Sequence, residues 1–134
     1  MNKSQVSIKE IKALWESHLG SLYNTQQLYI LTALPPQVIY RQIRQNILLA
    51  LKQKNGRYFY PAFQFNSQGD LKKGFSDIFS VFPLERCDRY TIASWFVSPQ
   101  PKLKSHTPVE WLDSGGSITV LYKIAQRVAA RLKQ

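Results

Sequence analysis

The sequence of 134 residues is short of cysteine, histidine and acidic side chains. It holds one Cys, two His, and eight Asp and Glu together. A single cysteine excludes an intramolecular disulfide, and one cysteine with two histidines is too few to build a zinc site. Cys87 is surrounded by charged residues in the segment Glu85–Arg89, so we expect an incidental surface thiol.

Several sequence patterns that mark enzymes, membrane proteins and secreted proteins are also missing. No apolar run approaches the roughly 20 residues that a membrane span needs. The N-terminal residues MNKSQVSIKE lack the apolar core of a secretory signal. No glycine-rich phosphate loop occurs, and nothing places His18 or His106 beside Cys87. We therefore predict a cytoplasmic protein that is not an enzyme and has no catalytic residue, metal or cofactor.

Positive charge and apolar residues are plentiful. Eighteen Lys and Arg against eight acidic residues give a net charge of +10, and 44% of the residues are hydrophobic. Three Trp, seven Tyr and seven Phe provide large side chains for a core. Such a charge favours a polyanionic partner such as nucleic acid, although a basic surface can also serve solubility alone.

Apolar periodicity and capping residues predict a fold that is mainly α with one short β-hairpin. Ser7 with Glu10, and Thr107 with Glu110, have the spacing of a capping box, while Thr25, Asp70 and Asp88 are candidate caps. The hairpin is predicted around Asn55-Gly56, a step suited to positive φ. The expected helices cover residues 6–19, 25–33, 35 onward, 70–82, 88–97, 107–112 and 117–132.

The segment from Pro35 to Phe65 suggests a helix that leads into a basic hairpin. Val38, Ile39, Ile43 and Ile47 form its apolar stripe, and long polar side chains occupy the other faces. Arg pairs with guanine and Gln with adenine in a major groove, and basic hairpin residues can meet phosphates. The candidate DNA-binding residues are Gln37, Arg41, Arg44, Gln45, Lys52, Lys54 and Arg57. The alternative is a solvated helix face beside a surface hairpin.

We predict two regions, a winged helix-turn-helix-like DNA-binding half over residues 1–65 and a helical half over 66–134. The aromatic stripe of Phe75, Phe79 and Phe82 is expected to pack in the core. The last helix carries small residues on its apolar face, which suits packing within the chain or a homodimer seam. We favour packing within the chain.

Residues 90–132 contain, in this order, a Trp-containing helix, a proline-bounded loop with a leucine, a Thr-Pro helix start, and a glycine before a terminal amphipathic helix. This order resembles the Xre/MbcA/ParS-type toxin-binding domain of bacterial type II antitoxins. One departure is that Lys104-Ser105-His106 stands where the family usually has a glycine pair. The residues that carry the likeness are Trp95, Pro99, Leu103, Thr107, Pro108, Leu112, Gly115 and the helix from Val120 to Leu132.

The resemblance implies an antitoxin that neutralises a cognate toxin through its C-terminal helices and binds operator DNA through its N-terminal half, as a homodimer. By position, the implied toxin contacts are Thr107, Pro108, Trp111, Leu112, Gly115, Arg127 and Arg131. A second reading is a stand-alone DNA-binding transcription regulator, or an excision-type factor, whose C-terminal half only dimerises. A third is a scaffold whose N-terminal half no longer binds DNA and contacts only protein.

Overall fold

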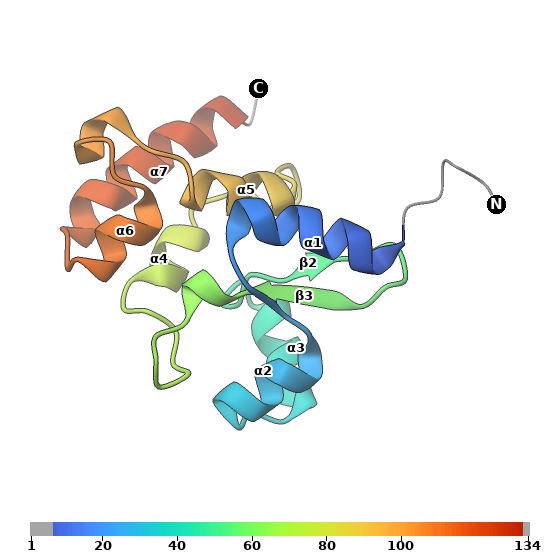
Figure 1. Ribbon diagram of the computed structural model, residues 1–134. Helices are drawn as coiled ribbons and strands as arrows, with labels where there is room; N and C mark the ends of the chain where they lie inside the picture. Colours follow the sequence, from blue (N-terminus) through green and yellow to red (C-terminus); the bar gives the residue numbers. More distant parts are fainter. Residues whose placement is uncertain (1–6, 133–134) are drawn as a thin grey trace.

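The computed structural model describes residues 7–132, and these residues fold mainly into helices around a small antiparallel sheet (Figure 1). The predicted mainly helical fold is confirmed, but the sheet has three strands where only a hairpin was expected. The α-helices are α1 Ile8–Leu19, α2 Thr25–Thr32, α3 Pro36–Arg44, α4 Phe75–Phe79, α5 Arg89–Phe96, α6 Pro108–Asp113 and α7 Ile118–Leu132. The strands are β1 Leu22–Tyr23, β2 Leu51–Lys52 and β3 Tyr58–Pro61, and the 3-10 helices are η1 Ala62–Gln64 and η2 Pro101–Leu103.

The sheet has the strand order β1-β3-β2, with both outer strands antiparallel to β3. Strands β2 and β3 form the predicted hairpin, in which Lys52 lies opposite Tyr58. Strand β1 adds the third member by pairing Tyr23 with Tyr60. Its two residues are too few to show an alternating pattern, which is why the sequence did not predict it.

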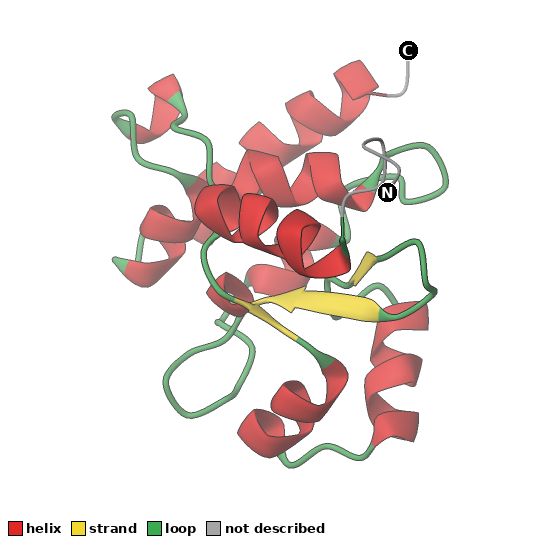
Figure 2. Ribbon diagram, turned by 45° about the vertical axis from the view of Figure 1, so that its right-hand side comes forward, coloured by secondary structure: helices red, strands yellow, loops and turns green. Residues whose placement is uncertain are grey.

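The sheet lies between two groups of helices, with α1 and α5 over one face and α2 and α3 under the other (Figures 1 and 2). Side chains alternate between the faces of a strand. Phe59 therefore joins the larger hydrophobic cluster with residues of α4, α5 and α7, whereas Tyr60 joins a smaller cluster with Ile39 and Ile43 of α3. The larger cluster draws residues from both sides of position 65, and the proposed division into two regions there stays a prediction.

Most predicted helix starts have the expected caps. The Asp88 side chain accepts a hydrogen bond from the backbone N–H of Tyr90 at the start of α5. Thr107 and Glu110 form both bonds of a capping box on α6. The cap of α2 is Asn24, not Thr25 as predicted, and it forms a capping box with Gln27. At α1 the Ser7 side chain caps Glu10 N–H, while residue 6 of the predicted helix lies outside the described residues.

The predicted helix over residues 70–82 is wrong at both ends, since only Phe75–Phe79 are α-helical. Leu71 instead forms an isolated bridge with Phe65, and Gly74 has a φ of 84°, so α4 begins only at Phe75. The rings of Phe75 and Phe79 lie 6.0 Å apart in the larger cluster, and Phe82 is also buried. The prediction that this aromatic stripe packs in the core is confirmed.

Two apolar helix residues are largely exposed. The side chain of Leu14 on α1 is 68% exposed and that of Ile30 on α2 is 74% exposed. On α7 the expected inner face is buried at Leu121, Ala125 and Ala129, so this face packs within the chain. None of the helices in residues 7–132 has both the length and the apolarity to traverse a bilayer.

Candidate nucleic-acid interface

Helix α3 buries one side and presents a polar side to solvent. Pro35 and Pro36 start the helix, since proline at the first turn loses only an unpaired N–H. Ile39 and Ile43 are buried. The exposed residues follow the spacing i, i+3, i+4 and i+7, which places them on one face: Gln37, Tyr40, Arg41 and Arg44. Gln45 is exposed just beyond the helix end, so the structure brings the four predicted α3 residues to one surface.

Tyr40 connects this exposed face of α3 to the hairpin and is not among the residues predicted from the sequence. Its ring centroid lies 6.4 Å from that of Tyr58, which lies 6.3 Å from that of Tyr60. The hydroxyls of Tyr60 and Thr25 are 3.2 Å apart, and burial raises the pKa of Tyr60. A groove of about 680 Å³ runs between the start of α2, Tyr40 and the hairpin, with Arg57 on its wall. The sequence could have indicated Tyr40, because it follows Gln37 by three residues and therefore lies on the same helix face.

The hairpin displays its cations on a closed turn. The N–H of Gln53 donates to the carbonyl of Arg57 at 2.8 Å, and that of Gly56 donates to Gln53 at 3.0 Å. Gly56 has a φ of 84°, whereas Asn55 has negative φ and uses its side chain to accept from Arg57 N–H. Lys52, Lys54 and Arg57 are all exposed.

A buried glutamine fixes the segment between α3 and the hairpin. The Gln64 side chain has no exposed surface. Its Oε1 accepts from Leu49 N–H at 3.0 Å, and its Nε2 donates to the carbonyls of Leu49 and Pro61 at 2.9 and 3.0 Å. Gln64 thus acts as a strand partner for Leu49, which lies outside regular secondary structure.

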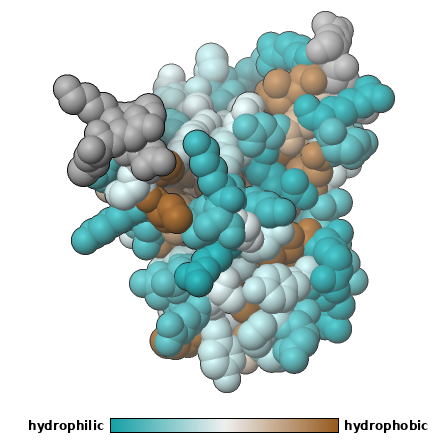
Figure 3. All heavy atoms as spheres, turned by 90° about the vertical axis from the view of Figure 1, so that its right-hand side faces the viewer, coloured by the Kyte–Doolittle hydropathy of each residue, from teal (hydrophilic) through white to brown (hydrophobic). Residues whose placement is uncertain are grey.

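The charge on this part of the surface has one sign. Residues 17–69 contain no Asp or Glu, and their Lys and Arg are the candidate residues Arg41, Arg44, Lys52, Lys54 and Arg57. The ion pair recorded within residues 7–132 is Lys72 with Asp113, so these five cations have no carboxylate partner there. Figure 3 shows that the side onto which the hairpin turn projects is mostly hydrophilic, with hydrophobic surface in scattered patches.

The predicted toxin contacts on α6 have structural roles. Pro108 is buried, and Thr107 belongs to the capping box. The Trp111 Nε1–H donates to the carbonyl of Ser117 at 2.9 Å. Its indole covers Gly116, where an added Cβ would lie 2.4 Å from the ring. Leu112 is partly buried and Gly115 is exposed with a φ of 76°.

Arg127 and Arg131 lie apart from that group, on the second half of α7. They are exposed and line a groove of about 450 Å³ whose floor includes Ile124 and Val128, with Lys102 on the opposite wall. The α6 residues do not line this groove. The predicted set therefore falls into two places, and the residues of α7 line a concave surface.

Cys87 is buried, which corrects the expectation of a surface thiol. It is 6% exposed and belongs to the larger hydrophobic cluster. Burial, with a contribution from Glu85, raises the pKa of the thiol, so little thiolate forms near neutrality. The His18 ring Nε2 lies 3.1 Å from Ser94 Oγ. Residues 7–132 contain no group of three His, Cys, Asp or Glu side chains placed to hold a metal ion.

Comparison with known proteins gives a fold and no family. No protein-family model and no curated protein sequence matches the chain. Among solved structures, the chain is similar to the NMR structure of Rv2175c, with a TM-score of 0.67 and 20% sequence identity over 81% of each chain. At that identity the likeness concerns the fold alone.

Proposed function

We propose that this protein binds double-stranded DNA, with the exposed face of α3 in the major groove and the hairpin on the phosphate backbone. The observation that carries the proposal is a surface with cationic and no acidic side chains, formed by Arg41, Arg44 and the cations of the hairpin. Unpaired cations repel one another in the free protein, and a polyanion removes that repulsion and releases counterions.

The order of elements supports the same proposal. The series α1-β1-α2-α3-β2-β3, with sheet order β1-β3-β2, is what a winged helix-turn-helix would have. In that arrangement α3 is the recognition helix and the β2–β3 hairpin is the wing. Guanidinium groups at Arg41 and Arg44 suit guanine edges, and Gln37 suits adenine. Lys54 and Arg57 suit phosphates.

The test is a DNA-binding titration with a labelled duplex taken from upstream of the gene. The double variant Arg41→Ala/Arg44→Ala should lose about 2–6 kcal/mol of specific binding free energy, at about 1–3 kcal/mol for each base contact. The matched control Arg127→Ala/Arg131→Ala removes the same charge from α7 and should bind like the wild type. Equal losses in both variants would reduce the effect to net charge and refute the proposed interface.

The groove on α7 favours a second candidate function, the binding of a partner protein. Its apolar floor and three cations, Lys102, Arg127 and Arg131, fit an acidic segment with apolar side chains. With the resemblance of residues 90–132 to an antitoxin domain, the proposed partner is a toxin encoded beside this protein. In the alternative reading, a stand-alone regulator, this half serves only to dimerise.

Co-expression with the products of adjacent genes separates these readings. A toxin partner should co-purify with the wild type and be lost with Arg127→Glu/Arg131→Glu, while DNA binding persists. If no adjacent product is toxic or co-purifies, the antitoxin proposal is wrong. Sedimentation equilibrium of the protein alone then measures the expected homodimer.

A further inference from the structure

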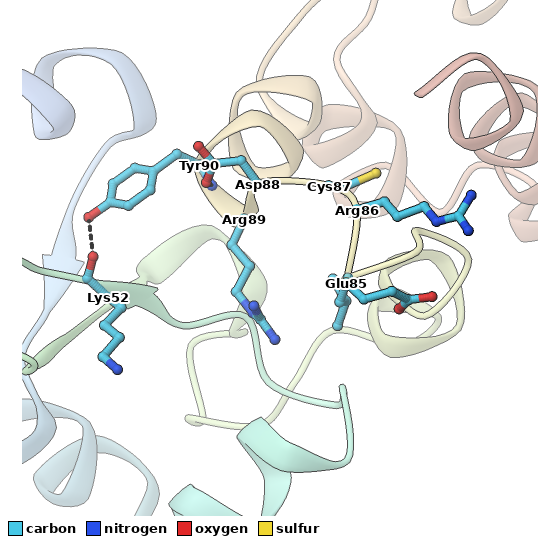
Figure 4. A pocket seen from close by; sticks show the side chains of 8 residues that line it. Lys52, Glu85, Arg86, Cys87, Asp88, Arg89 and Tyr90 are labelled. Atoms are coloured by element: carbon cyan, nitrogen blue, oxygen red, sulfur yellow. Dashed lines mark hydrogen bonds between the residues drawn. The ribbon is translucent and has the colours of Figure 1, made fainter. Parts of the chain in front are cut away.

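A pocket beside strand β2 is shared by the two halves of the chain. It has a volume of about 400 Å³ and is lined by Lys52 from the hairpin and by the segment Leu84–Tyr90 (Figure 4). The Tyr90 hydroxyl donates to the carbonyl of Lys52 at 3.1 Å, which holds the start of α5 against the edge strand. The Trp15 ring packs on Tyr90 at 4.6 Å and supports that position.

Lys52 and Arg89 extend in the same direction from this junction, as Figure 4 shows, whereas Glu85 and Arg86 point away from Lys52. Leu51 faces the cluster with α5, so the next residue, Lys52, faces the opposite side of the sheet, where Tyr58 lies against the α3 cluster. Because β2 is an edge strand, Arg89 can pass beside it toward the α3 side.

The fold itself gives no reason for a cation at position 89. Arg89 is the first residue of α5, and the positive end of a helix dipole disfavours a cation there. No ion pair is recorded for it within residues 7–132, since the nearby Asp88 carboxylate accepts from Tyr90 N–H. Arg89 is also partly buried, which costs hydration of its charge. An anion between Lys52 and Arg89 would supply the missing ion pair and would offset the unfavourable helix dipole and the lost hydration.

We infer that Lys52 and Arg89 together hold one phosphate of the DNA backbone, so that the interface continues past the hairpin onto the C-terminal half. The inference rests on the proposed function and extends it to a residue outside the predicted DNA-binding half. The path runs along the α3 face, across Tyr40 and Tyr58, and past the β2 edge to Arg89.

The salt dependence of binding tests the inference, because each phosphate contact adds about 0.9 to the slope of log K against log[salt]. We would measure fluorescence anisotropy with a labelled 24-base-pair duplex of mixed sequence between 0.05 and 0.3 M KCl. Arg89→Gln should lower the slope by about 0.9 and weaken binding about eightfold at 0.1 M KCl. Arg89→Lys should retain most of the slope and most of the affinity. Arg127→Gln should change neither the slope nor the affinity.

The outcomes separate this inference from the function it extends. If Arg89→Gln binds like the wild type while Arg41→Ala/Arg44→Ala loses binding, the interface ends at the hairpin and only the inference fails. If the wild type does not bind the duplex at 0.05 M KCl, both fail. A purely structural role for Arg89 would lower Tm in Arg89→Gln and Arg89→Lys alike, and that result would also overturn the inference. We expect the Tm of Arg89→Gln to be unchanged or slightly higher.

Discussion

Replacing Gln64 by leucine removes the brace between α3 and the hairpin while keeping a similar side-chain volume. The change abolishes the three hydrogen bonds of the buried amide. It leaves the N–H and C=O groups of Leu49 without their partner, and each buried polar group that lacks a hydrogen bond costs about 1–3 kcal/mol. We therefore expect the free energy of unfolding to fall by about 3–4 kcal/mol, a large part of the 5–15 kcal/mol typical of a domain.

Urea unfolding followed by fluorescence of the three tryptophans measures this loss. With a slope of about 1.5–2 kcal/mol/M, the midpoint should move down by about 2 M. The matched control is Gln68→Leu, the same change at an exposed position in a neighbouring turn, which should stay within about 0.5 kcal/mol of the wild type. Equal stabilities of the two variants would refute the bracing role.

Gln64→Glu adds a pH test of the same contact. A carboxylate still accepts from Leu49 N–H, but it must be protonated to donate to the carbonyls of Leu49 or Pro61, and burial raises its pKa. A raised folded-state pKa means that stability is highest below the unfolded value of about 4.3 and is lost as the pH rises. The deficit relative to the wild type should therefore be wider at pH 7 than at pH 4.5.

Four further predictions concern the C-terminal half. Thr107→Ala should lower the free energy of unfolding in urea by about 1 kcal/mol, because the cap of α6 is lost. An unchanged free energy would mean that the capping box does not stabilise the protein. The backbone and side-chain hydrogen bonds with Thr107 lower the pKa of Glu110, so its carboxylate stabilises the fold above its ordinary pKa, and this contribution is lost as the pH falls. Acid melts should show this loss in the wild type and not in Glu110→Gln, whose amide oxygen can still accept from Thr107 N–H. Cys87 should react with Ellman's reagent about 100-fold more slowly in the native protein than in urea, and equal rates would contradict its burial. Gly116→Ala should lower Tm by several degrees because the new methyl group meets Trp111, and an unchanged Tm would contradict that close contact.

The parts of the fold that could be predicted have strong local signals. The cap at Asp88 and the capping box at Thr107 lie within four residues of the groups they bind, so the sequence alone locates α5 and α6. The charged face of α3 likewise follows from a 3.6-residue period. The same period wrongly predicted a helix at Leu71. Leu71 instead pairs with Phe65, and helical periodicity does not indicate such a contact.

The unpredicted parts of the candidate site depend on contacts between distant segments. Tyr40 lies beside the hairpin because its ring meets Tyr58, which follows eighteen residues later in the chain. Arg89 reaches the hairpin edge because Tyr90 bonds to the backbone of Lys52. Cys87 lies in a charged sequence and is nevertheless buried, since its neighbours turn their charges outward. Composition and residue spacing do not predict these contacts.

An NMR titration of ¹⁵N-labelled protein with duplex DNA from upstream of the gene tests the central claim most directly. The claim predicts shifts at the amides of residues 37–45 and 52–58, with small changes on α6 and α7. The shifts on α3 should vanish for Arg41→Ala/Arg44→Ala. Shifts confined to α6 and α7, or no shifts at 0.05 M salt, would contradict the proposal that α3 and the hairpin bind DNA.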